Sequence, residues 1–256
     1  MIDQLNREVR TYKKPNRIVS VVPSQTELLY DLGLDVEVIG ITKFCIHPIH
    51  WFKTKQRVGG TKNLNIKLIQ SLEPDLILAN KEENEREQIE LLIQFCPVWI
   101  SDINSLQQAN DMIHQIGVLT DTKERANDII NQIILKDYHI PKTSLRVLYL
   151  IWKDPYMAAG TDTFIHEMIQ KAGFVNALDQ KRYPILSNDE IQIIQPDLIF
   201  LSSEPYPFKA KHIAELATIC PGIPIKLVDG ELFSWYGSRL LHSFDYFSAL
   251  HEEFVP

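Results

Sequence analysis

Cysteines, basic clusters and long apolar runs are scarce in this chain, and each shortage excludes a class of protein. Three cysteines (Cys45, Cys96 and Cys220) occur among 256 residues and cannot all pair, which argues against a disulfide framework. Cys96 and Cys220 each precede a proline at the edge of an apolar strand, so we expect both in the core. The net charge of −7, without a block of lysine and arginine, argues against nucleic acid or an anionic membrane as partner.

Membrane and export signals are also missing from the sequence. No window approaches the ~20 uninterrupted apolar residues of a membrane-spanning helix, so we expect no direct insertion into a membrane. Residues 1–8 (MIDQLNRE) carry no apolar signal-peptide core. At 45% hydrophobic residues, the chain can bury ample core in one large or two small domains.

The usual signatures of catalysis are absent as well. There is no G-x-G-x-x-G turn, no phosphate loop, no G-x-S-x-G nucleophile elbow, and no pair of carboxylates at an obvious strand end. The sequence therefore predicts no catalytic residue and no required cofactor.

The chain does contain one segment that occurs twice in similar form. Residues 69–77 (IQSLEPDLI) recur as residues 191–199 (IQIIQPDLI). Each copy indicates the end of an amphipathic helix, a Pro-Asp break, and then a short buried strand. Residues 17–22 likewise match 146–151, and 97–100 match 224–227, in the same order within each half. A period this long indicates two like α/β lobes rather than a solenoid.

Strands and helices alternate in both halves, which predicts parallel sheets covered on both faces. The domain boundaries that follow are 1–103 for the N-terminal lobe, 104–140 for a linking helical segment, and 141–256 for the C-terminal lobe. We expect strands near 17–22, 37–41, 75–79, 97–100, 146–151, 197–202 and 224–228. Helices are expected near 25–32, 65–73, 84–95, 162–172, 188–195 and 209–217.

The linking segment is expected to end in one long helix. Residues 104–139 contain no glycine or proline except Gly117. Asp121 or Thr122 would cap the helix, and an apolar face would comprise Ala126, Ile129, Ile130, Ile133 and, less securely placed, Ile134. The fold class is therefore α/β, with two Rossmann-like lobes linked by a single long backbone helix.

Several motifs in their order resemble a known family. Residues 17–34 (RIVSVVPSQTELLYDLGL), 38–41 (VIGI), 58–60 (VGG) and 72–77 (LEPDLI) are similar to the helical-backbone, class III substrate-binding proteins of ABC importers. Residues 3–9 look like the first strand of that family, and 159–176 like the start of its second lobe. The resemblance covers nearly the whole chain, and the cobalamin-binding members fit best.

The resemblance implies a function and a location. Members of this family capture cobalamin, ferric siderophores, haem or metal ions in a cleft between two lobes, and partner subunits, an ABC-transporter permease among them, carry out transport. The location is expected to be periplasmic if a leader was trimmed, and cytoplasmic if Met1 is the native start. By alignment, Lys67 and Ser234 stand where cobalamin-binding members have docking carboxylates, and Asn80 and Ile185 stand where those members have tryptophans.

Ligands of open parallel sheets bind beyond the carboxyl ends of the strands, which selects seven loops. These are residues 23–27, 42–51, 80–86, 152–162, 182–187, 203–208 and 230–239. In the first loop, Ser24 and Glu27 are interpreted as a capping box, which leaves the side chain of Gln25 for a ligand.

Aromatic and cationic side chains in these loops suit a large planar ligand with acidic groups. Aromatic rings would stack on a macrocycle, although about half of them are expected to anchor their own loops instead. Lys81, Arg182 and Arg239 would bind carboxylates or phosphate, and Arg239 has the alternative of bracing the final helix. The remaining ligand-binding candidates are Phe44, His47, Trp152, Tyr156, Tyr183, Tyr206, Trp235 and Tyr236.

A metal site is a weaker alternative. Cys45, His47 and His50 are candidate ligands within one loop, but no C-x-x-C or H-E-x-x-H pattern supports them. The leading hypothesis is the substrate-binding component of an ABC importer for a metal chelate: cobalamin, ferric siderophore or haem. The alternatives are a receptor for free zinc, manganese or iron, and a cytoplasmic chelate-binding carrier, sensor or enzyme without a transporter partner.

Overall fold

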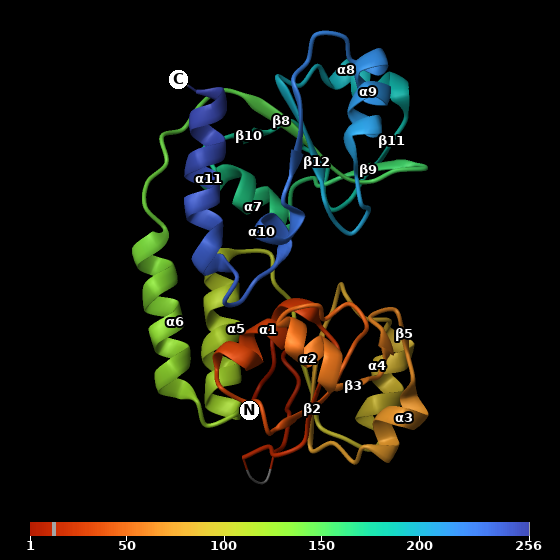
Figure 1. Ribbon diagram of the computed structural model, residues 1–256, viewed down its shortest axis with the longest axis vertical. Helices are drawn as coiled ribbons and strands as arrows, with labels where there is room; N and C mark the ends of the chain where they lie inside the picture. Colours follow the sequence, from red (N-terminus) through yellow and green to blue (C-terminus); the bar gives the residue numbers. More distant parts are fainter. Residues whose placement is uncertain (12–13, 256) are drawn as a thin grey trace. The chain divides into compact units, whose positions relative to one another are not determined.

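The computed structural model describes residues 1–11 and 14–255. By their contacts these residues form two units, each with its own sheet (Figure 1). The first unit contains the chain up to Ile103, then Gln107–Ile133 and Tyr236–Arg239. The second contains Asn104–Leu106, Ile134–Trp235 and the chain from Leu240 onward.

The sheet of the first unit has five parallel strands in the order β3-β2-β1-β6-β7. Its three central strands are almost wholly buried, as expected for a parallel sheet covered on both faces. The four strands predicted in this half are confirmed, while β3 and a short hairpin of β4 and β5 were not predicted. The strands are β1 (Ile18–Ser20), β2 (Val38–Ile41), β3 (Gln56–Arg57), β4 (Gly59–Gly60), β5 (Asn63–Leu64), β6 (Leu76–Asn80) and β7 (Val98–Ser101).

The helices of this half follow the predicted positions, with one addition. Helix α2 was missed, because its six residues are too few to show a helical period and follow directly on Pro48. Residues 3–9 were predicted as a strand but form a turn, in which the Asp3 carboxylate accepts hydrogen bonds from the amides of Leu5 and Arg7. The helices are α1 (Pro23–Asp31), α2 (Ile49–Thr54), α3 (Ile66–Ser71), α4 (Arg86–Ile93), α5 (Leu106–Leu119) and α6 (Lys123–Lys136).

Helices α5 and α6 run side by side in opposite directions (Figure 1). Gly117 permits this packing, since a Cβ atom there would lie 2.4 Å from the Cβ of Ala126. Ala126, Ile129 and Ile133 form the buried face of α6, as predicted, whereas Ile134 is 57% exposed. The boundary between the units falls between Ile133 and Ile134, so α6 carries the chain from one unit into the other.

The sheet of the second unit repeats the parallel core and adds an antiparallel edge. Its order is β11-β9-β8-β12-β13, with β10 also paired to β8. Strands β8, β12 and β13 are parallel and match the three predicted strands, while β9 and β11 are antiparallel and were not predicted. The strands are β8 (Arg146–Trp152), β9 (Tyr156–Ala158), β10 (Val175–Asn176), β11 (Ile185–Leu186), β12 (Leu198–Ser202) and β13 (Ile225–Val228).

Three predicted helices of the second half are confirmed, and two more follow the last strand. Their packing is largely aromatic: the Phe233 ring lies 4.6 Å from that of Phe247 and 5.1 Å from that of Tyr149, between centroids. The helices are α7 (Phe164–Lys171), α8 (Asn188–Ile194), α9 (Ala210–Ile219), α10 (Gly230–Ser234) and α11 (Leu240–Phe254).

The duplicated segment forms closely similar contacts in both units. In the first, the Asp75 carboxylate accepts hydrogen bonds from the backbone amides of Asn16 and Arg17, both at 2.9 Å. The Arg17 guanidinium in turn donates to the carbonyl oxygens of Leu72 and Glu73, directly after α3. The backbone at Glu73 is left-handed, with φ at 46°. One arginine thus ties the start of a central strand to the end of the helix before the neighbouring strand.

The second unit repeats these contacts, except that its aspartate accepts a hydrogen bond from one backbone amide instead of two. The Asp197 carboxylate accepts a hydrogen bond from the Arg146 amide at 2.7 Å. The Arg146 guanidinium donates to the carbonyl oxygens of Ile194 and Gln195 at 3.1 and 3.2 Å, after α8. Gln195 also has φ at 46°. We call this arrangement the arginine latch: Arg17 with Asp75 in one unit, and Arg146 with Asp197 in the other.

Replacing a latch arginine should destabilise the protein. In Arg146→Ala the last carbonyl groups of α8 lose charged donors at the negative end of a helix, so we expect a loss of about 1 kcal/mol in the free energy of unfolding. Urea denaturation followed by circular dichroism measures it. Arg10→Ala is the matched control, because the Arg10–Glu8 pair is more than half exposed on both sides and should contribute little. Equal stabilities of the two variants would contradict a structural role for the latch.

Candidate functional site

Each sheet has one pair of adjacent strands whose following connections lead toward opposite edges of the sheet. In the first unit this pair is β1 and β6, and in the second it is β8 and β12. Loops that follow such strands diverge and leave a crevice at the carboxyl ends, which is where open α/β sheets bind ligands. The loops of interest therefore follow β1 and β6 in one unit, and β8 and β12 in the other.

Gln25 lies in the segment that follows β1 of the first unit. Its side-chain nitrogen donates to the hydroxyl oxygen of Ser101 at 2.6 Å, and the Asn80 amide donates to the same oxygen at 2.9 Å. All three side chains are buried. Within the described residues, the Gln25 carbonyl oxygen has no hydrogen-bond partner. The fold thus joins the predicted Gln25 to the ends of β6 and β7, which the sequence did not link to it.

The capping box predicted at Ser24 and Glu27 is wrong. Helix α1 begins at Pro23, and its N-cap, Val22, makes no side-chain cap. Proline suits the first helical position, because it lacks the amide hydrogen that would stay unpaired there, so the helix starts earlier than the box requires. Glu27 instead forms a two-bond ion pair with Arg239, with distances of 2.8 and 2.6 Å. Arg239 is therefore engaged within the first unit.

The loop that follows β2 places the metal candidates apart from one another. The Cys45 thiol lies 3.1 Å from the hydroxyl oxygens of both Thr26 and Thr42, and burial raises its pKa to about 11. His50 is exposed and packs against the ring of Tyr30, at 5.1 Å between centroids. In residues 1–11 and 14–255, no group of three or more His, Cys, Asp or Glu side chains is arranged for a metal ion.

Two further candidates lie in the same loop. Phe44 is 51% exposed, and the Lys43 ammonium lies 5.1 Å from the centre of its ring. His47 is partly buried and precedes Pro48. An exposed ring beside a cation is available for a planar ligand, whereas the thiol of Cys45 is not.

The other predicted cations are also engaged. Lys81 forms an ion pair with Asp102 at 2.6 Å. Arg182 donates to the Asn104 side chain at 3.1 Å and to the Asp162 carbonyl oxygen at 2.7 Å. Its guanidinium also lies 5.4 Å from the centre of the Tyr183 ring. These cations brace their own loops in the structure.

Three predicted aromatic residues gather beside α9. Trp152 is the last residue of β8, is 40% exposed, and meets the ring of Tyr206 edge-on at 5.6 Å between centroids. Tyr206, in the loop that follows β12, packs in turn on Phe208 at 4.8 Å. Tyr156 lies in β9 and is 8% exposed within the core. Trp152 and Tyr206 thus lie together at the carboxyl ends of β8 and β12, while Tyr156 is chiefly a core residue.

Trp235 and Tyr236 are buried, with 6% and 7% of their surfaces exposed. The Trp235 ring nitrogen donates to an oxygen of Glu204 at 3.1 Å, and the Ser234 hydroxyl donates to the same oxygen. Glu204 was not a candidate from the sequence. The available signal was its position: a lone acid two residues after β12, inside a loop already selected for ligand binding.

The environment of Glu204 disfavours its charged form. Burial among protein atoms raises the pKa of this carboxyl group, while the hydrogen bonds from Ser234 and Trp235 act in the opposite direction. The nearby acids Asp229 and Glu231 raise the pKa further. Replacing Glu204 with glutamine would keep an acceptor for both donors without burying a charge.

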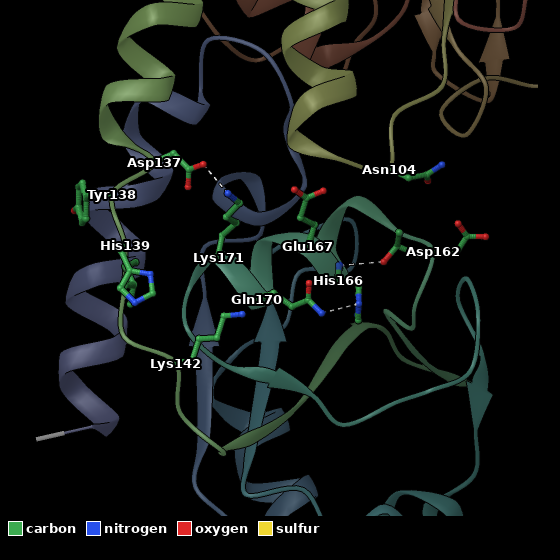
Figure 2. A pocket seen from close by; sticks show the side chains of 12 residues that line it. Asn104, Asp137, Tyr138, His139, Lys142, Asp162, His166, Glu167, Gln170 and Lys171 are labelled. Carbon is green, nitrogen blue, oxygen red and sulfur yellow. Dashed lines mark hydrogen bonds and ion pairs between the residues drawn. The ribbon is translucent and has the colours of Figure 1, made fainter.

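A separate pocket of about 510 Å³ lies in the second unit, between α7 and residues 137–142 (Figure 2). Several of its polar groups bind one another: Lys171 pairs with Asp137 at 2.5 Å, and the Glu167 carboxylate accepts a hydrogen bond from the Leu106 amide. None of the predicted ligand-binding residues lines it. Its lining ties α7 to the start of α5 and to the chain after α6.

Comparison with known proteins identifies the family. A family model described as "Periplasmic binding protein" matches residues 18–218. The chain belongs to the periplasmic binding protein family. It is 29% identical over 212 residues to an uncharacterised ABC transporter substrate-binding lipoprotein of Bacillus subtilis (strain 168), which spans 77% of this chain and 67% of that protein.

Two further similarities fit this family. The chain is 26% identical over 243 residues to a vitamin B12-binding protein of Pectobacterium carotovorum (strain PC1), which spans 90% of this chain and 86% of that protein. The solved structure of a periplasmic haem-binding protein of Vibrio cholerae has the same fold, with a TM-score of 0.77 and 21% sequence identity. The match covers 94% of this chain and 99% of that chain.

Family membership confirms the predicted class of protein. Periplasmic binding proteins bind substrates and are not enzymes, so the prediction of a receptor without a catalytic residue or cofactor stands. The two-lobed α/β fold with a backbone helix is confirmed as well. In the part of the chain that the structure describes, no helix has both the length and the apolar character to cross a membrane.

The raised pKa of Glu204 predicts how stability depends on pH. Because the folded-state pKa lies above the unfolded-state value, folding favours the protonated group, and the native protein loses stability as pH rises from the unfolded-state value through the folded-state value. Glu204→Gln avoids this loss. Its midpoint of thermal unfolding should exceed that of the native protein at pH 7.5 and match it near pH 4. An equal difference at both pH values would show that Glu204 is not the titrating group.

Proposed function

We propose that this chain is the receptor of an ABC importer for a metal chelate, and that a corrinoid is the first ligand to test. Ferric siderophores and haem are the other members of the same chemical class. The observation that carries the proposal is the placement of Trp152 and Tyr206 at the divergence point of the second unit. A partly exposed indole there offers a flat apolar surface to a macrocycle.

The first unit supports the proposal with groups of a different kind. Gln25 presents a buried carbonyl oxygen that no described residue hydrogen-bonds, and Phe44 presents an exposed ring. A buried acceptor without a partner is costly, and a hydrogen bond from a ligand would remove the cost. A chelate with both a flat apolar face and polar edge groups could supply a stacking surface for Phe44 and a donor for Gln25.

The names of relatives support this ligand class. One relative is described as a vitamin B12-binding protein, and a protein of the same fold as a haem-binding protein. By contrast, the arrangement of Cys45 and His50 offers little to a free metal ion, because the thiol is enclosed by hydroxyl groups. A chelate therefore fits the described side chains better than a bare ion.

We also propose a transporter permease as the partner and the periplasmic side of a membrane as the location, since one relative is described as an ABC transporter substrate-binding lipoprotein. Lys67 on α3 is an exposed cation, and the Ser234 hydroxyl donates a hydrogen bond to Glu204. Neither position supplies a docking carboxylate, so docking would use other surface groups.

Removing the indoles should weaken chelate binding without unfolding the protein. We expect Trp152→Ala and Trp235→Ala each to raise the dissociation constant for cyanocobalamin about tenfold. The first variant would lose apolar contact with the ligand, and the second would lose the ring that orients Glu204. Absorbance and fluorescence titrations measure the affinity, with haemin and ferric siderophores run in parallel.

Tyr138→Ala is the control for this experiment, because Tyr138 is an aromatic residue of the second unit, 42% exposed and outside the selected loops. Its affinity should equal that of the native protein. Unchanged affinity in both tryptophan variants, with binding intact, would move the site elsewhere. No binding of any chelate would reject the proposed function.

A further inference from the structure

Glu204 stands out among the charged groups of the second unit by its position. It follows β12 by two residues, in a loop that bends back on the strand: the Ser202 hydroxyl donates to the Glu204 carbonyl oxygen. Helix α10 begins directly against it, since a Cβ atom on Gly230 would lie 2.8 Å from the Glu204 Cγ. The absence of a side chain at Gly230 therefore leaves room for the Glu204 side chain beside the start of α10.

The two oxygens of this carboxylate differ in their surroundings. Oε1 accepts hydrogen bonds from both Ser234 and Trp235. For Oε2, no hydrogen bond or ion pair is found among residues 1–11 and 14–255. The carboxylate is therefore held in one orientation by Oε1, while Oε2 keeps its capacity to accept.

The groups around Glu204 do not neutralise it. The titratable groups that act on it are the acids Asp229 and Glu231 of the α10 segment, and it acts in turn on the Tyr149 phenol of β8. Among the described residues, no lysine or arginine forms an ion pair with Glu204. Its side-chain hydrogen bonds come from the neutral donors Ser234 and Trp235, so these donors do not neutralise the carboxylate form. An additional N–H group would be a strong partner for that form.

Three predicted ligand-binding cations differ from Glu204 Oε2, because they are already bound to oxygen acceptors. Lys81 is paired with Asp102, Arg239 with Glu27, and Arg182 with two oxygen acceptors. An incoming carboxylate would have to compete with these partners, whereas an incoming N–H donor finds Oε2 without competition. At Glu204 the arrangement of charges thus favours a ligand that donates hydrogen bonds.

We propose, resting on the proposed function, that Glu204 determines specificity: its Oε2 accepts a hydrogen bond from an amide N–H of the bound chelate, so that a chelate edged with carboxamides is preferred to one edged with carboxylates. A carboxylate-edged ligand would place like charges together and lose the hydrogen bond. Trp235, fixed by Oε1, keeps the carboxylate oriented for this contact.

The test compares two corrinoids with the same ring. The heptaamide of dicyanocobyrinic acid carries carboxamide side chains, and dicyanocobyrinic acid itself carries carboxylic acids in their place, with the same axial ligands. At pH 7.5 the native protein should bind the amide form at least about tenfold more tightly, as one hydrogen bond to a charged group predicts. In Glu204→Gln, the side-chain nitrogen replaces an acceptor with a donor, so the ratio of the two dissociation constants should fall to about twofold or less.

Glu253→Gln is the matched control, because Glu253 is an acid of the same unit that lies on α11 and is paired with Lys226 of β13. Its ratio should equal that of the native protein. If both corrinoids bind and Glu204→Gln leaves the ratio unchanged, Glu204 has only a structural role and the inference is wrong, while the proposed function survives. Tighter binding of the acid form, or of haemin, by the native protein would also overturn it. If no chelate binds the native protein, the proposed function itself fails.

Discussion

The arginine latch is the contact on which the rest of each unit depends. A parallel sheet needs every strand to be followed by a helix that returns to the same edge, and the latch fixes that return by joining a helix end to the start of a central strand. Arg17 and Arg146 each bind the carbonyl groups that their helix cannot satisfy internally. The aspartate after each proline then binds the strand amides, so one short segment sets the register of two neighbouring strands.

The latch lies at the amino ends of the strands, whereas the candidate ligand-binding residues lie at the carboxyl ends. This separation frees the carboxyl-end loops from holding the sheet together. In the first unit those loops carry Gln25, with an acceptor that no described residue uses, and in the second they carry Trp152 and Glu204. The stabilising contacts and the candidate ligand-binding residues therefore lie at opposite ends of the same strands, an arrangement that fits the proposed receptor.

Much of the fold could be predicted from the sequence, because buried parallel strands are short apolar runs and the duplicated segment marks both lobes. The antiparallel strand β11 was missed because it has only two residues and no apolar period. The site was harder to predict. The loops were located from the strand ends, but side-chain partners depend on tertiary packing: Glu27 binds Arg239 from far along the chain, and the Glu204 contact to Trp235 joins two separate loops. Neither pairing leaves a pattern in the sequence.

The most direct test of a receptor that binds at the strand ends is hydrogen–deuterium exchange with and without cyanocobalamin. Bound ligand should slow exchange in the peptides that cover the loops after β1, β6, β8 and β12, because it would exclude water and order the backbone there. Peptides that cover the latch segments should be unchanged. Protection confined to the pocket beside α7, or no protection under conditions where the ligand is bound, would contradict binding at the strand ends.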